Sequence, residues 1–218
     1  MVAEFLGDPR YFRDKFFAEG GYSMKASLLA LIVLGLAQVV TGTPITFIAS
    51  LSGANENPAT NSAGTGFATV IIDSATNLME VNVQFSGLLT VTGTGAPSGT
   101  TASHIHCCVA PGGNAGVATT TPTFPGFPLG VTSGSYDQIF NMTLATSYNP
   151  AFVTAEGGLA AAEAALFAGM AAGQTYLNIH STTFPGGEIR GFLVATPEPG
   201  TWLLLSAALL PLAFRRRR

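Results

Sequence analysis

The stretch at residues 66–85, GFATVIIDSATNLMEVNVQF, is the most informative part of the chain about its fold class. Its first part, residues 66–73, is rich in β-branched side chains, which favour strands. Asp, Ser, Thr and Asn follow and are typical of a turn. After the turn, Val81, Val83 and Phe85 alternate with polar residues, as in a half-buried strand. The two parts together predict an antiparallel hairpin.

Strand patterns dominate the chain on both sides of this hairpin. They occur at residues 45–52, 101–109, 134–144, 174–181 and 188–194. Residues 110–130 are rich in Pro, Gly and Thr and predict a long loop. Residues 157–173 are alanine-rich, free of proline and bounded by glycines, which predicts a helix. We therefore expect an all-β fold, an antiparallel Greek-key-like β-sandwich or flattened barrel with one inserted Ala-rich helix.

Charge is unusually sparse in residues 43–195, which have the length of one domain. Arg190 is their only basic residue, and they contain no lysine. The acidic residues of this stretch are Glu56, Asp73, Glu80, Asp137, Glu156, Glu163 and Glu188. This balance excludes nucleic acid as a partner, because binding phosphates requires a basic surface.

The N-terminal part has the layout of an export signal. In residues 24–42, Lys25 precedes an apolar stretch, and small and polar residues follow up to Pro44, as in a secretory signal peptide. Ala37 and Gly42 are both small enough to precede the cleavage site. Residues 1–23 are charged and aromatic. Either they are a long n-region, or translation starts at Met24.

The pattern of the C-terminal part, residues 197–218, indicates a sorting tail. It combines Pro197, Glu198 and Pro199, an uncharged run over residues 202–214, and a cluster formed by Arg215, Arg216, Arg217 and Arg218. The run is shorter than the ~20 residues that span a bilayer comfortably, and the arginines favour the cytoplasmic side. A tail anchor or a buried C-terminal helix is the alternative.

The order of these features resembles the PEP-CTERM sorting signal of bacteria. The resemblance implies transient membrane insertion of the tail as a transmembrane segment and its removal by an exosortase. Signal peptidase is then the partner at the other end. It also implies an exported protein at the cell surface, in the outer envelope or in the extracellular matrix, with a membrane-inserted precursor.

All three histidines of the chain lie in two short motifs, residues 102–106 (ASHIH) and 176–180 (YLNIH). His104 and His106 are two positions apart on a strand and project to one face. Asn178 and His180 also share a face with Tyr176. If the two strands are neighbours, three imidazoles converge.

Three separated motifs resemble the CHRD domain, a repeat named after chordin. They are residues 51–58 (LSGANENP), residues 103–106 (SHIH, with Ser where the family has Ala), and residues 176–180 followed by 186–191 (GGEIRG). The resemblance covers residues 45–194 and implies a β-rich extracellular module. It implies no settled activity, and no catalytic residue is assigned.

The histidines have two interpretations. In the first they organise the sandwich by hydrogen bonds across strands, with Glu188 and Arg190 as partners, because buried polar groups need partners. Arg190 then forms a bidentate bond to Glu56 or Glu188. In the second, His104, His106 and His180 bind Zn or Cu, as imidazole sets do. The H-x-H pair resembles the copper ligands of copper/zinc superoxide dismutases, but the rest of that pattern is missing.

Cys107 and Cys108 are the only cysteines. On a regular strand Cys108 shares the histidine face and becomes a further metal ligand. A buried free thiol, an intermolecular bridge and a strained vicinal disulfide are the alternatives.

Two function classes follow. The first is a noncatalytic surface or matrix module that associates with extracellular polysaccharide or other surface proteins. The second is a small exported metalloprotein with a three-histidine Zn or Cu site.

Overall fold

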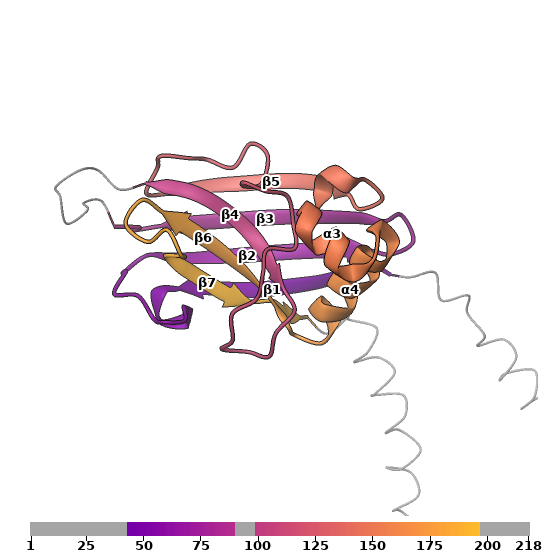
Figure 1. Ribbon diagram of the computed structural model, residues 1–218. Coiled ribbons are helices and arrows are strands. Elements are labelled where there is room, and N and C mark those ends of the chain that lie inside the picture. The colour runs from indigo at the N-terminus through magenta and orange to yellow at the C-terminus, as the bar shows by residue number, and fades with distance from the viewer. Residues whose placement is uncertain (1–42, 90–98, 197–218) are drawn as a thin grey trace, which may run out of the picture. The chain divides into compact units, whose positions relative to one another are not determined.

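The computed structural model describes residues 43–89 and 99–196. The predicted signal peptide at residues 24–42, the segment 1–23 and the sorting tail at 197–218 lie outside these residues. The described strands are β1 (Ile45–Ser52), β2 (Thr65–Asp73), β3 (Leu78–Ser86), β4 (Thr100–Cys107), β5 (Gly134–Asn141), β6 (Thr175–Ser181), β7 (Ile189–Phe192) and β8 (Val194–Ala195). Two short 3-10 turns, η1 (Gly53–Asn55) and η2 (Ala145–Ser147), and two helices, α3 (Pro150–Glu156) and α4 (Leu159–Ala171), complete the elements (Figure 1).

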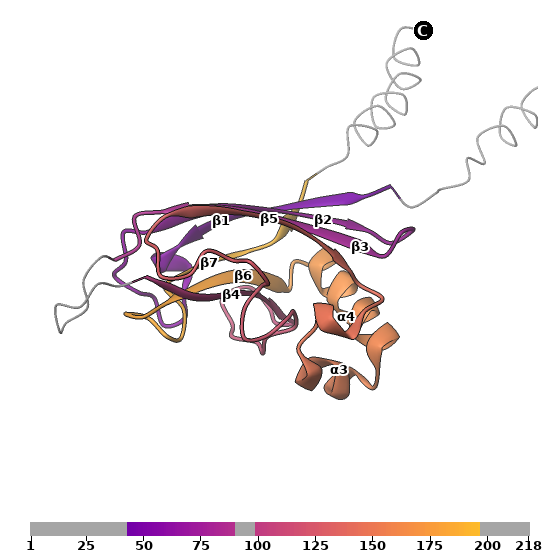
Figure 2. The same ribbon diagram turned by 90° about the horizontal axis from the view of Figure 1, so that it is seen from above.

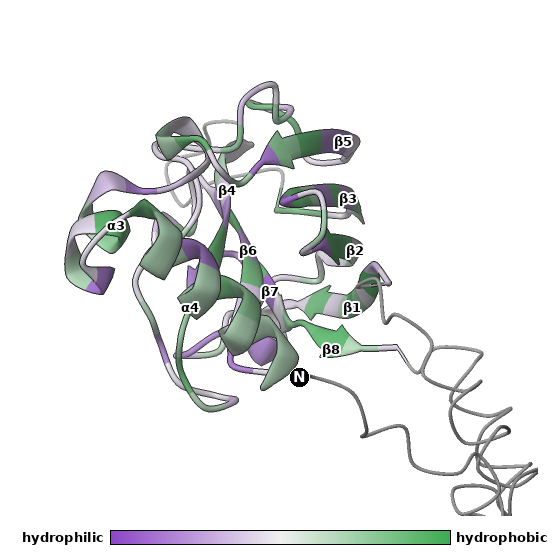
Figure 3. Ribbon diagram, turned by 90° about the vertical axis from the view of Figure 1, so that its right-hand side faces the viewer, coloured by the Kyte–Doolittle hydropathy of each residue, from purple (hydrophilic) through white to green (hydrophobic). Residues whose placement is uncertain are grey.

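The strands form one antiparallel sheet in the order β4-β6-β7-β1-β2-β3-β5, and β8 pairs with β1. The sheet curls, so that β1, β2, β3 and β5 face β4, β6 and β7 in two layers (Figure 2). Figure 3 shows the curled sheet in a view along the strands, with α3 and α4 beside it. The predicted all-β class, in its flattened-barrel form, is confirmed.

β2 and β3 form the predicted antiparallel hairpin. It pairs Thr65 with Ser86 at one end and Asp73 with Leu78 at the other. The Asp73 carboxylate accepts a hydrogen bond from the backbone N–H of Ala75 at 2.9 Å and so fixes the turn. The alternating residues of β3 are buried as expected.

The core lies between the two layers. Phe47, Val70 and Val81 of one layer and Ile105 and Leu177 of the other are fully buried. Burial of apolar area is the main favourable term in folding, so this contact holds the curl closed.

The loop between β4 and β5 fills the gap between these two edge strands. Its Phe124 is fully buried and stacks on Tyr136 of β5, with ring centroids 5.7 Å apart. The backbone N–H of Phe124 also bonds to the carbonyl of Ser103 on β4 at 3.1 Å. The long loop expected at residues 110–130 is therefore a structural part of the barrel.

The described residues contain two helices where the sequence predicted one. α4 is the expected Ala-rich helix, and its Leu166 and Met170 are fully buried. α3 begins at Pro150, after Asn149 caps its first turn by accepting from the N–H of Ala151 at 3.0 Å, and Gly157 ends it. Proline at the first helical position is a helix start, not a break.

Within residues 43–89 and 99–196, no single helix is long and apolar enough to cross a membrane. α3 and α4 pass that test of length and composition only as a pair, and they are bent by 93° at their junction.

The buried face of α4 gives the first prediction. We expect Leu166→Ala to lower the free energy of unfolding by about 2–5 kcal/mol, because it leaves a cavity in a fully packed site. Leu144→Ala is the matched control, since Leu144 is 51% exposed. Urea unfolding measures both. Equal losses in the two variants contradict the packing of α4 described here.

Candidate functional site

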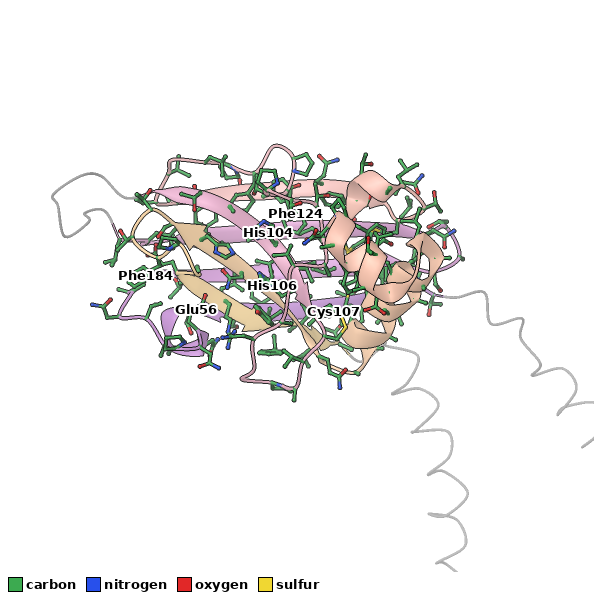
Figure 4. The ribbon with its side chains drawn as sticks, in the orientation of Figure 1. Glu56, His104, His106, Cys107, Phe124 and Phe184 are labelled. Atoms are coloured by element: carbon green, nitrogen blue, oxygen red, sulfur yellow. A yellow bond between two sulfur atoms is a disulfide. The ribbon has the colours of Figure 1, made fainter. Side chains whose placement is uncertain are left out.

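The site lies on the outer face of β4 and β6. Ile105 on β4 and Leu177 on β6 point into the core, so the residues on either side of each point away from it. His104 and His106 therefore lie on the outer face of β4, as predicted, and Figure 4 shows them one after the other along that strand. His180 lies on the same face of β6, which pairs with β4.

The three imidazoles converge. Their ring centroids lie 5.9 Å apart for His104 and His106, 5.2 Å for His104 and His180, and 6.0 Å for His106 and His180. One ring nitrogen from each lies within 4.8 Å of the others. One such distance, 3.4 Å, joins His104 Nδ1 to His180 Nε2. The predicted meeting of the two motifs is confirmed.

Backbone carbonyls hold all three rings. The bonds run from His104 Nε2 to Pro122 at 2.6 Å, from His106 Nδ1 to Ala115 at 2.9 Å, and from His180 Nδ1 to Pro185 at 2.9 Å. A carbonyl only accepts, so each of these nitrogens carries the proton of its neutral ring. The remaining nitrogens, His104 Nδ1, His106 Nε2 and His180 Nε2, are therefore left with free lone pairs. His106 Nε2 is buried and has no hydrogen-bond partner among the described residues.

The rings are uncharged at neutral pH. Burial lowers the pKa of His104 and of His106 to about 4, because it penalises the charged imidazolium. Burial also lowers the pKa of His180. Three neutral imidazoles with converging lone pairs are a set of metal ligands held in place by outer hydrogen bonds.

An aromatic stack supports one side of the cluster. The ring of Tyr176 lies on that of His106 at 4.6 Å, nearly parallel at 7°. Its hydroxyl donates to the carbonyl of Ala115 at 3.3 Å, the same carbonyl that holds His106. The guanidinium of Arg190 lies over the Tyr176 ring at 4.6 Å.

Arg190 and Glu56 form a single ion-pair contact, with Arg190 Nε 3.8 Å from Glu56 Oε2. The predicted bidentate bond is therefore wrong. The guanidinium donates from Nε to the carbonyl of Asn55 at 2.6 Å, from Nη1 to Asn114 Oδ1 at 2.7 Å and from Nη2 to the carbonyl of Gly112 at 3.4 Å. Each of its nitrogens thus bonds to a loop, and Arg190 joins these loops to its own strand.

Asn178 connects this pair to the histidine face, since its side-chain amide donates to Glu56 Oε2 at 3.4 Å. Burial raises the pKa of Glu56 to about 7, although the charge of Arg190 opposes that rise. The carboxyl of Glu56 therefore takes up a proton at a higher pH than an exposed glutamate does.

Glu188 does not bond to the histidines. It is fully buried, and its Oε1 accepts from the hydroxyl of Ser62 at 2.6 Å and from the N–H of Leu89 at 2.7 Å. The predicted partnership of Glu188 and Arg190 with the imidazoles is replaced by main-chain carbonyls. Sequence reasoning missed these because a carbonyl belongs to every residue type and leaves no signal.

Cys108 is not part of the cluster. β4 ends at Cys107, so the alternation that placed Cys108 on the histidine face stops there. Cys107 and Cys108 form a disulfide with each other, one of the alternatives left open by the sequence. Its sulfurs lie 3.9 Å and 3.6 Å from the carbonyl oxygen of Ala165 on α4.

The fold and the site define an all-β module with a buried cluster of three histidines. A comparison with protein families matches residues 47–193 to the CHRD domain. The chain therefore belongs to the CHRD domain family. No curated protein and no solved structure matches the chain.

Gly187 gives a prediction for the site. A Cβ at this position lies 2.8 Å from both Asn178 Oδ1 and Glu56 Oε1, and φ is +135°. We expect Gly187→Ala to destabilise the fold by roughly 1–3 kcal/mol through this clash and backbone strain. Gly186→Ala is the control, because a Cβ there meets nothing within 4 Å. Denaturant midpoints that agree for the two variants contradict the close approach.

The histidines predict a pH dependence of the metal-free protein. Their folded pKa is below the ordinary value of 6.5, near 4 for His104 and His106, so the unfolded chain binds more protons between these limits. Stability from this source is present above pH 6.5 and is lost as the pH falls toward 4. Glu56 acts in the opposite sense, because its raised pKa gives the folded state an extra proton between pH 4.5 and about 7.

The comparison of wild type with His106→Gln isolates the histidine contribution. Both proteins keep Glu56, but the variant lacks one titrating ring. We expect the stability difference between them to shrink as the pH falls from 7 to 5, measured by urea unfolding with chelator present. A difference that is constant over this interval contradicts the lowered pKa.

Proposed function

We propose that this chain is an exported, noncatalytic module of the CHRD type, in which His104, His106 and His180 bind one Zn or Cu ion. The observation that carries the metal site is the set of three free nitrogen lone pairs that meet in one buried place. Every other ring nitrogen is already bonded to a carbonyl.

The distances fit such an ion. Zn–N bonds are about 2.0–2.1 Å, so two ligands of a tetrahedral ion lie roughly 3.3–3.4 Å apart. His104 Nδ1 and His180 Nε2 are 3.4 Å apart before any adjustment. All three ligand atoms lie within 4.8 Å of one another, so a small adjustment of the rings brings them to the separation of tetrahedral ligands. Imidazole suits both Zn and Cu, and three ligands leave one position open.

The same geometry argues against acid–base catalysis by these histidines. Each ring proton is held by a main-chain carbonyl, and a pKa near 4 makes His104 and His106 weak bases at neutral pH. A binding or structural role fits better, and membership of the CHRD family supports it.

The proposal of export is based on the two predicted end segments, the signal peptide at residues 24–42 and the sorting tail at residues 197–218. Their processing requires signal peptidase and an exosortase-type enzyme. Ala195 of β8 pairs with Phe47 of β1, and the N–H of Thr196 bonds to the carbonyl of Thr46 at 2.8 Å, so the two ends of the described domain lie side by side. The extracellular partners are then polysaccharide or other surface proteins.

Metal analysis of the exported protein tests the proposal. After chelation and reloading with Zn or Cu(II), we expect one ion per chain. His104→Ala and His106→Ala each lose a direct ligand, so their affinity falls by more than the ~100-fold that outer partners cost. Gln138→Ala, exposed on β5, is the control. Negligible metal in wild type and variants alike rejects the site, and the intact mass of the same sample shows whether residues 197–218 were removed.

A further inference from the structure

A hollow beside the ion pair of Glu56 and Arg190 has no role in the metal site. Its volume is about 570 Å³, and its lining includes both residues, Phe192 and two asparagines, Asn55 and Asn57. Arg190 is 1% exposed and Glu56 is 9% exposed, so charged side chains lie buried in its wall. The volume falls in the range of small-molecule sites.

We infer that this hollow binds a hydroxyl-bearing ring of a neutral polysaccharide. The inference rests on the proposed function only for the location of the protein outside the cell. Three features support a sugar as the ligand. They are the hydrogen-bonding groups of the hollow, its apolar aromatic surface and the charge of the domain.

The hollow is lined by a carboxyl and a guanidinium close together, because Arg190 Nε and Glu56 Oε2 lie 3.8 Å apart. The Nε–H is donated to the carbonyl of Asn55, so the donors left for a ligand are the second N–H groups of Nη1 and Nη2. Glu56 Oε1 is buried and has no hydrogen-bond partner among the described residues. A sugar hydroxyl both donates and accepts, so two neighbouring hydroxyls match a carboxylate beside a guanidinium.

An aromatic ring supplies the apolar surface that the C–H face of a sugar needs. Phe192 is half-buried and lines the hollow. A second hollow of about 240 Å³ shares Glu56 and Asn57 and is lined by Phe184. Figure 4 shows Glu56 and Phe184 at neighbouring positions on this side of the domain. The two hollows give room for consecutive rings of one chain.

Charge selects a neutral chain. Arg190 is the only basic residue of residues 43–195, against seven acidic residues, Glu56, Asp73, Glu80, Asp137, Glu156, Glu163 and Glu188. A polyanion is repelled by this domain at long range. The single positive charge of the hollow is also paired with Glu56.

The hollow is separable from the metal ligands, since no histidine lines it. Ala54 offers a way to block it, because this exposed residue of η1 lines the hollow and its side chain is small. Ala54→Tyr fills the hollow and removes no buried group, whereas Ala54→Ser leaves it open.

Affinity electrophoresis of the full exported protein tests the inference in gels that contain a neutral α-glucan, a neutral β-glucan, a galactomannan or a polygalacturonate. We expect at least one neutral gel to retard the wild type and Ala54→Ser equally. Ala54→Tyr should bind roughly tenfold more weakly, the size of losing one hydrogen bond to a charged group. Glu56→Gln should weaken binding similarly. His104→Ala should bind like wild type, because the ring of His104 bonds to the carbonyl of Pro122, which does not line the hollow.

Three outcomes overturn the inference: no retardation in any neutral gel, equal retardation of Ala54→Tyr and wild type, or retardation by polygalacturonate alone. Metal content is measured on the same samples. Loss of sugar binding with metal retained therefore refutes only the polysaccharide site. Loss of metal in wild type refutes only the histidine centre.

Discussion

The antiparallel pairing of β4 with β6 is the constraint on which the site depends. It places His104 opposite Asn178 and His106 opposite Tyr176, and it brings His180 diagonally next to His104. Side chains two positions apart on a strand point the same way, so this register alone gathers all three imidazoles on one face. A shift of one residue would turn the histidines into the core and Ile105 out of it.

The three imidazoles are buried on the outer face of the sheet, so their ring nitrogens lose hydrogen bonds to water. Main-chain carbonyls replace one of these bonds for each ring. Loops that follow β4 and β6 pass over the outer face, and they offer the carbonyls of Ala115, Pro122 and Pro185. An unpaired polar group in such a place is costly. Each ring therefore has one satisfied nitrogen and one nitrogen in need of a partner. His106 Nε2, which is buried and unpaired among the described residues, shows where the compensation is incomplete.

Sequence patterns predict what depends on side-chain type and spacing. Alternation locates the hairpin of β2 and β3, and the spacing of His104 and His106 places both on one face. Sequence patterns do not predict features that depend on the main chain. β4 ends at Cys107, so Cys108 does not lie on the histidine face. The carbonyls that hold the rings belong to the main chain and cannot be recognised from residue types. α3 was not predicted, because its seven residues are too few for a periodic pattern and its start depends on the side-chain cap of Asn149.

The buried Arg190 links segments that are distant in sequence. A buried ion pair is weak evidence for stability by itself, since desolvation offsets its attraction. Here the guanidinium bonds to the carbonyl of Asn55 in the first motif and to Asn114, whose neighbour Ala115 holds His106. Arg190 thus connects the loop of Glu56, the loop that positions a histidine, and its own strand β7. Its loss would leave Glu56 buried beside Asn178 without its counter-charge and would free the loop that fixes the ring of His106.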